Sequence, residues 1–383
     1  MKETTLQSTP PLGADCNSQQ PSFIRRRSFL QGLGVSGAML LPTTLLADHD
    51  NHRRKKLPRG DVAVLRFLAA AELIESDLWQ QYNELGGVKG GNAAYMAAIE
   101  NLDEDMPQYI ADNTDDELSH AAFLNAYLES RGEQPVNLDA FRTLPSSMAT
   151  GAKQIGRLTN LQNLNVDTSW YTRYRSEENP DFGATFPQAV HIVGEPAIPL
   201  NDADTPPDMM QPLVPVTSQQ RRMQAIANTA GFHFAFIEQG GSSLYTIMSL
   251  KVTSLEVLRI VVSIGGTEVN HFAVWHDKAG NAVNVTDPET GVVFPDLNSP
   301  PLGGEQFQTN LIFPEPCDFL KGEKLPPCSV IRPTLDKNGG AVATIKAFTE
   351  DGLFMGQSGA FFEAAMELAV AADAARRERG DDD

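Results

Sequence analysis

Glu117-Leu118-Ser119-His120 and Glu268-Val269-Asn270-His271 repeat one spacing, a carboxylate three residues before an imidazole, in two long amphipathic stretches. On an α-helix, residues i and i+3 lie one above the other on the same face. Each pair can therefore offer one oxygen and one nitrogen ligand to a single metal ion. Two such helices, with one Glu from each of two further helices, form the carboxylate site for two metal ions found in some four-helix bundles.

The apolar residues of four segments recur at helical spacing and predict such a bundle. The segments cover about residues 61–85, 106–131, 218–248 and 254–276, and a shorter helix is expected over 93–102. Glu72 and Glu75 fall on the inward face of the first helix, and Glu238 on that of the third. The chain therefore supplies all four parts of a di-metal site in the required order.

A weak internal repeat supports the same arrangement. Glu75 lies seven residues before Tyr82, and Glu238 lies seven residues before Tyr245. Each half thus contains a helix with Glu and Tyr, followed by a helix with Glu-x-x-His. The repeat predicts two equivalent half-sites and favours Glu75 as the ligand from the first helix.

The residue types indicate which metals would bind. Carboxylates and imidazoles suit iron or manganese better than metals that prefer sulfur. Several carboxylates buried together would repel one another or take up protons, whereas two divalent cations cancel their charge. We therefore expect two metal ions, Fe or Mn, as cofactors.

On these motifs the sequence resembles the ferritin-like superfamily. The resemblance implies a mainly α fold and metal ligands at Glu117, His120, Glu238, Glu268 and His271. The sequence is also similar to secreted ferritin-like proteins related to plant desiccation proteins, in which Glu-x-x-Glu precedes an aromatic residue. The counterpart here is Glu72-Leu-Ile-Glu75 with Trp79, which favours Glu72 as the first ligand, so Glu72 and Glu75 are both candidates.

Two other histidines lie near these positions in the sequence. His233 is five residues from Glu238 and is expected to point off its face, and His276 borders a helix end. Tyr82 and Tyr245 are expected in the core, where either hydroxyl could hydrogen-bond to a ligating carboxylate.

The remaining segments do not fit a minimal bundle. Residues 133–216 are irregular and rich in proline, and their length suits a long crossover within a bundle that spans 61–279. Residues 280–355 contain short candidate strands at 282–285, 291–294 and 341–345. Residues 356–383 are expected to form a C-terminal helix, over about 358–379, and an acidic tail.

The first 47 residues have the features of an export signal. Arg25-Arg26-Arg27-Ser28-Phe29-Leu30 precedes a short apolar run, and this pattern resembles a twin-arginine signal. A membrane anchor is the alternative, but the run is short for a spanning helix. The resemblance implies passage through the twin-arginine translocation machinery to a periplasmic or extracellular location. A basic linker, 48–60, follows, and no stable membrane span is expected after processing.

The charge and the cysteines narrow the choice of partners. The formal net charge of −19 argues against nucleic acid and suits a protein that attracts cations. Cys317 and Cys328 would remain after processing, and a disulfide between them is expected in an oxidising compartment.

The sequence therefore predicts an exported di-metal protein that oxidises iron or reacts with O2 or peroxide, as a ferroxidase-like or manganese-catalase-like oxidoreductase. No catalytic residue is assigned beyond the metal ligands. The alternative is a non-enzymatic stress-related or surface scaffold protein with the same fold. The size of the extra segments argues against a storage cage, and a homo-oligomer is compatible with the sequence.

Overall fold

The computed structural model describes residues 56–173, 188–206, 217–299 and 339–378, and the backbone of two short strands at 314–315 and 328–329. The expected signal, most of the basic linker and the expected Cys317–Cys328 disulfide lie outside the described residues. Within them, no helix has both the length and the apolar composition needed to cross a bilayer.

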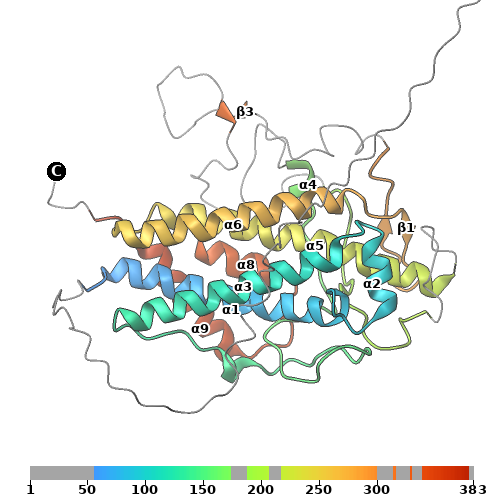
Figure 1. Cartoon of the computed structure of the whole chain (residues 1–383), viewed down its shortest axis with the longest axis horizontal. Coiled ribbons are helices and arrows are strands. Elements are labelled where there is room, and N and C mark those ends of the chain that lie inside the picture. The colour runs from blue at the N-terminus through green and yellow to red at the C-terminus, as the bar shows by residue number, and fades with distance from the viewer. Residues whose placement is uncertain are drawn as a thin grey trace, which may run out of the picture. The chain divides into compact units, whose positions relative to one another are not determined.

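Four long helices run alongside one another and form a bundle (Figure 1). They are α1 (Arg59–Gly86), α3 (Met106–Ser130), α5 (Ser218–Ser249) and α6 (Leu255–Ala279). Helix α1 packs along α3, and α5 packs along α6. The four helices expected from the sequence are confirmed, with every end within three residues of its expected position.

Local signals set the ends of these helices. A capping box begins α5, in which the side chains of Thr217 and Gln220 bond reciprocally to backbone N–H groups. Ser254 caps α6 through its hydroxyl. Gly132, with φ of 78°, follows α3 in the left-handed conformation that commonly ends a helix. The short helix α2 (Ala93–Glu100) starts at Asn92, whose side chain accepts the N–H of Tyr95.

The described part of the crossover between α3 and α5 lies against the bundle rather than forming a free loop. It contains the 3-10 turn η3 (Asp139–Phe141) and the short helix α4 (Trp170–Arg173). The buried carboxylate of Asp77 on α1 accepts the backbone N–H groups of Leu158 and Thr159, at 2.9 and 3.0 Å, and pairs with Arg142 at 2.6 Å. One side chain of α1 thus anchors two separate stretches of the crossover.

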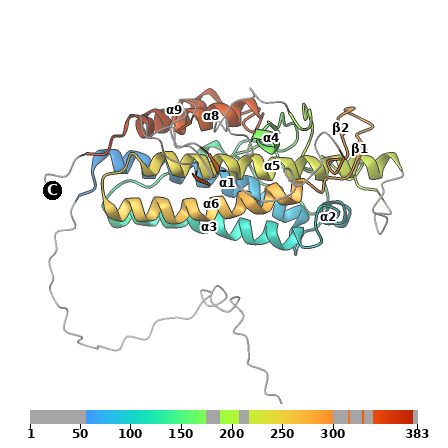
Figure 2. The same cartoon turned by 90° about the horizontal axis from the view of Figure 1, so that it is seen from above.

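The C-terminal region combines short strands with two more helices. Strands β1 (Val285–Thr286) and β2 (Val293–Phe294) pair antiparallel, as do β3 (Pro314–Glu315) and β4 (Cys328–Ser329). Helices α8 (Ala341–Glu350) and α9 (Gly359–Ala374) follow. Figure 2 shows α8 and α9 on the side of α1 and α5 that faces away from α3 and α6.

The expectation of a strand over 341–345 was wrong, because these residues form the first half of α8. The carboxylate of Asp373 on α9 accepts the N–H groups of Ala341 and Val342 at 3.1 and 2.9 Å. These bonds satisfy donors that the first helical turn leaves unpaired. The partner lies 31 and 32 residues away in the sequence, beyond the reach of a local pattern.

A similar long-range cap joins α1 to α6. The side chain of Asp61 is buried, and its two oxygens accept the N–H groups of Thr253 and Ser254 at 2.8 and 2.9 Å. The start of α6 is therefore fixed against the start of α1, which sets the register of Glu268 and His271 relative to Glu72.

Replacement of Asp61 by Ala is expected to lower the free energy of unfolding by roughly 1–3 kcal/mol, because two buried donors lose their acceptor. Chemical denaturation measures this loss. Asp105 is the matched control, since it is likewise an Asp at the start of a helix but is exposed and makes no side-chain cap bond. Equal destabilisation by Asp61→Ala and Asp105→Ala would contradict the role given to Asp61.

Candidate metal centre

Six of the seven residues expected to bind metal meet inside the bundle. Glu72 comes from α1, Glu117 and His120 from α3, Glu238 from α5, and Glu268 and His271 from α6. All six are buried, with the histidines the most exposed at 8% and 6%. They form two overlapping groups, within each of which the potential ligand atoms lie within 4.8 Å of one another.

Glu117 and Glu268 belong to both groups. The first group adds Glu72 and His120, and the second adds Glu238 and His271. Glu117 spans the centre, since one of its oxygens lies 3.2 Å from His120 Nδ1 and the other 3.1 Å from His271 Nδ1. The same ring atom of each histidine therefore faces the carboxylates.

Glu75 is the seventh candidate, and it belongs to neither group. It is buried nearby, and its pKa is raised well above the ordinary value by burial first and then by the charge of Glu268. The repeat that favoured Glu75 also breaks at its tyrosines. The hydroxyl of Tyr245 donates to Glu72, whereas that of Tyr82 lies 2.7 Å from His233 Nδ1.

The electrostatics of the cluster follow from burial. Burial raises the pKa of Glu72 to about 8 and, with the neighbouring charge of Glu117, raises that of Glu268 well above the ordinary value. Burial also opposes ionisation of Glu117, but hydrogen bonds with His120 and His271 hold its pKa at about 2. In both histidines burial acts to lower the pKa, and the surrounding carboxylates overcome this effect and raise it. Without metal, protons thus balance much of the negative charge.

The cluster also has unused capacity to bind cations. Oε2 of Glu72 and both carboxylate oxygens of Glu268 are buried and accept no hydrogen bond among the described residues. Nδ1 of His120 lies 3.4 Å from Glu72 Oε2 and 3.4 Å from Glu268 Oε1, but this one ring nitrogen already faces Glu117 at 3.2 Å. Buried acceptors without partners are costly. These atoms lie in the groups described above, so the donor set fits two metal ions held by oxygen and imidazole nitrogen.

Two further residues support the cluster and were not identified as site residues from the sequence. The amide of Asn113 donates to Glu117 at 2.8 Å and to Glu238 at 3.0 Å, and its oxygen accepts the indole N–H of Trp275 at 2.8 Å. Asp116 lies 3.1 Å from His271 Nε2. Asn113 stands one helical turn before Glu117, and this spacing is the signal that could have identified it.

The other two histidines lie apart from both groups. His233 contacts Tyr82 and, at 3.1 Å, Asp351. His276 stacks on Tyr171, with ring centroids 5.6 Å apart. The expectation that they do not join the cluster agrees with these contacts.

Glycines give the cluster its space. A Cβ atom at Gly241 would lie 2.4 Å from Oε2 of Glu268, and one at Gly265 would lie 2.8 Å from Cβ of Tyr245. Helix α5 therefore carries no side chain where the shared carboxylate of Glu268 reaches it.

Gly241→Ala is expected to displace the Glu268 carboxylate and to lower the free energy of unfolding by about 1–3 kcal/mol, the usual cost of overpacking. Gly266→Ala is the control, because its added Cβ would meet nothing within 4 Å. This control should be neutral or stabilising by up to about 1 kcal/mol. Thermal unfolding of the metal-free proteins tests both, and a neutral Gly241→Ala would refute the steric argument.

Comparison with known proteins agrees with the fold. No curated protein and no solved structure shows significant similarity to the chain. A family model described as the ferritin-like domain matches residues 60–281, which is more than half of the chain and includes every residue of the two ligand groups. The chain therefore belongs to the ferritin-like domain family.

Proposed function

We propose that this protein binds two iron or manganese ions in the cluster and uses them to oxidise iron or to react with O2 or peroxide. One observation carries the proposal: the two groups of four potential ligands share Glu117 and Glu268. Shared carboxylates are what a pair of adjacent cations requires, because each carboxylate can offer one oxygen to each ion.

The proposed ligand set divides evenly. Glu72 and His120 would hold one ion, Glu238 and His271 would hold the other, and Glu117 and Glu268 would lie between them. When bound, such a pair supplies redox chemistry toward O2 or peroxide. Oxygen and imidazole donors suit both iron and manganese.

The surrounding residues would orient these ligands. Asp116 accepts from Nε2 of His271, which leaves Nδ1 of that ring for the cluster. Tyr245 fixes one oxygen of Glu72, and Asn113 fixes one oxygen each of Glu117 and Glu238. Trp275, 1% exposed, donates its indole N–H to Asn113 beside the cluster, and its buried ring would help to keep water away from that side.

We expect the protein from its own host to contain about two Fe or Mn ions per chain, the number that the two-group ligand set would hold. The double variant His120→Ala, His271→Ala should lose bound metal and melt at a lower temperature, because metal binding to the native state adds to its stability. Elemental analysis and calorimetry measure both effects.

His191→Ala is the matched control, because this histidine is exposed and lies outside both ligand groups. It should keep the metal content and the melting temperature of the wild type. A wild-type protein that holds neither iron nor manganese after reconstitution would reject the proposed function and favour a scaffold role.

We further propose export through the twin-arginine route, on the basis of Arg26 and Arg27 before Ser28-Phe29-Leu30. Replacing both arginines by Lys keeps the positive charge, so a general secretory signal or a membrane anchor would tolerate the change. A twin-arginine signal should not, and precursor should accumulate inside the cell. Cell fractionation decides between them, and normal export of the variant would exclude this route.

A further inference from the structure

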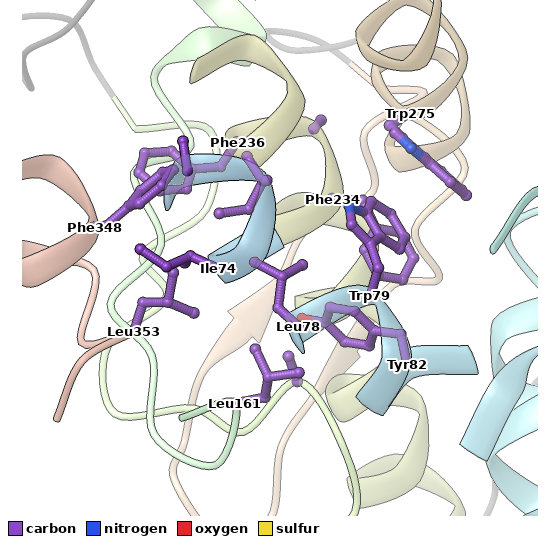
Figure 3. Close-up of a cluster of buried hydrophobic side chains, with 14 of the residues drawn as sticks. Ile74, Leu78, Trp79, Tyr82, Leu161, Phe234, Phe236, Trp275, Phe348 and Leu353 are labelled. Atoms are coloured by element: carbon purple, nitrogen blue, oxygen red, sulfur yellow. The ribbon is translucent and has the colours of Figure 1, made fainter. Parts of the chain in front are cut away.

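Aromatic side chains lead away from the metal centre. The N–H of Trp275 is bonded to Asn113, which in turn is bonded to Glu117 and Glu238. The rings of Trp275 and Trp79 stack with centroids 5.3 Å apart, and the ring of Tyr82 follows at 5.8 Å from Trp79 (Figure 3). Three buried rings that can be oxidised thus lie next to one another in space, in the order Trp275, Trp79, Tyr82.

Beyond Tyr82, two hydrogen bonds extend this row of side chains. The hydroxyl of Tyr82 lies 2.7 Å from His233 Nδ1, and His233 Nε2 lies 3.1 Å from Asp351. A carboxylate oxygen and a phenol hydroxyl thus lie at the two nitrogens of one ring, and the tautomer that donates from Nε2 to Asp351 accepts from the phenol at Nδ1. Burial raises the pKa of Tyr82 well above its ordinary value, so the phenol is neutral and has a base in contact with it.

Asp351 also lines a cavity of about 650 Å³ between α8 and the crossover. Its second carboxylate oxygen, Oδ1, is buried and has no hydrogen-bond partner among the described residues. The cavity wall has an apolar part that includes Phe236 and Val342, and its carboxylates outnumber its basic groups, Lys346 and His191. This lining suits a neutral aromatic molecule with hydroxyl donors better than an anion.

We propose that the cavity binds a neutral aromatic diol, and that Trp275, Trp79, Tyr82, His233 and Asp351 form a relay that brings electrons from it to the metal centre one at a time. The proposal rests on the proposed function, because the oxidant is the metal pair after its reaction with O2 or peroxide. The rate of electron transfer falls steeply with distance, so rings in contact replace one long transfer by short ones.

Each transfer balances in electrons and protons. Tyr82 gives one electron, through Trp79 and Trp275, to the oxidised centre, and its phenolic proton moves to His233 Nδ1. The diol then returns one electron to Tyr82, which takes its proton back from His233. One hydroxyl proton of the diol passes to Asp351 and leaves to solvent through the cavity that this residue lines. Two such transfers convert the diol to a quinone and reduce the centre by two electrons.

The first test follows the radical on Tyr82. Protein loaded with Fe(II) is mixed with peroxide, frozen rapidly and studied by electron paramagnetic resonance. A tyrosyl signal should form in the wild type, disappear in Tyr82→Phe, and persist in Tyr95→Phe. Tyr95 is an equally buried control whose hydroxyl donates to a backbone carbonyl at 2.7 Å. An unchanged signal in Tyr82→Phe, or no signal in wild type of full metal content, overturns the relay.

A second test does not need metal. The metal-free protein is oxidised by photogenerated tris(bipyridine)ruthenium(III), and transient absorption follows the tyrosyl radical. Tyr82→Phe should remove the signal and His233→Phe should slow its formation, whereas Tyr95→Phe should not. A protein that binds no metal would reject the proposed function, yet this measurement would still support or overturn the relay.

The diol site is tested by calorimetric titration of the metal-free protein with hydroquinone and with ascorbate. Hydroquinone should bind and ascorbate should not. Asp351→Asn should weaken hydroquinone binding about tenfold, the loss expected for a hydrogen bond to a charged group. Ala343→Phe, which fills the cavity without altering Asp351, should abolish it. Absence of hydroquinone binding by the wild type, or equal binding by both variants, overturns the assignment.

Discussion

The buried negative charge at the centre of the bundle is the constraint on which the rest of the structure depends. Four carboxylates meet there, with Glu75 beside them, and two imidazoles are the basic groups in the two ligand groups. Each ionised carboxylate that is buried without a neutralising partner costs several kcal/mol of folding free energy. Four such charges would cost more than the total stability of a typical domain, so the cluster cannot be fully ionised without bound cations. Protons or cations must therefore be part of the folded core. The raised pKa of Glu72, about 8, shows how the protein meets this need without metal.

Three other acidic side chains, two buried and one half-buried, are stabilised in a different way. Asp61, Asp77 and Asp373 each accept two backbone N–H groups from a segment distant in sequence. Peptide donors stabilise these charges, and in return the carboxylates fix the starts of α6 and α8 and the path of the crossover. The shared carboxylate of Glu268 has no such donors, and this contrast separates a structural acid from one that would suit a cation.

Sequence reasoning succeeded where the information is local. The helical period and the i, i+3 spacing predict that Glu117, His120, Glu268 and His271 face one interior, and in the structure these residues lie together. It failed for α8, whose first turn depends on Asp373 some thirty residues later. It left Glu72 and Glu75 open, because two residues three positions apart lie on the same helix face and cannot be told apart until the neighbouring helices are placed. It overlooked Asp116, since a partly exposed carboxylate has no pattern to mark it.

The internal repeat brings two half-sites together but does not make them equal. Asp116 faces the outer nitrogen of His271, and among the described residues no carboxylate pairs with the outer nitrogen of His120. A carboxylate in that position makes an imidazole a stronger electron donor. Two ions in the cluster would therefore differ in affinity and in reduction potential. Such a pair would fill in order and would change oxidation state one ion at a time, so that an approximately twofold sequence pattern would yield two unlike metal positions.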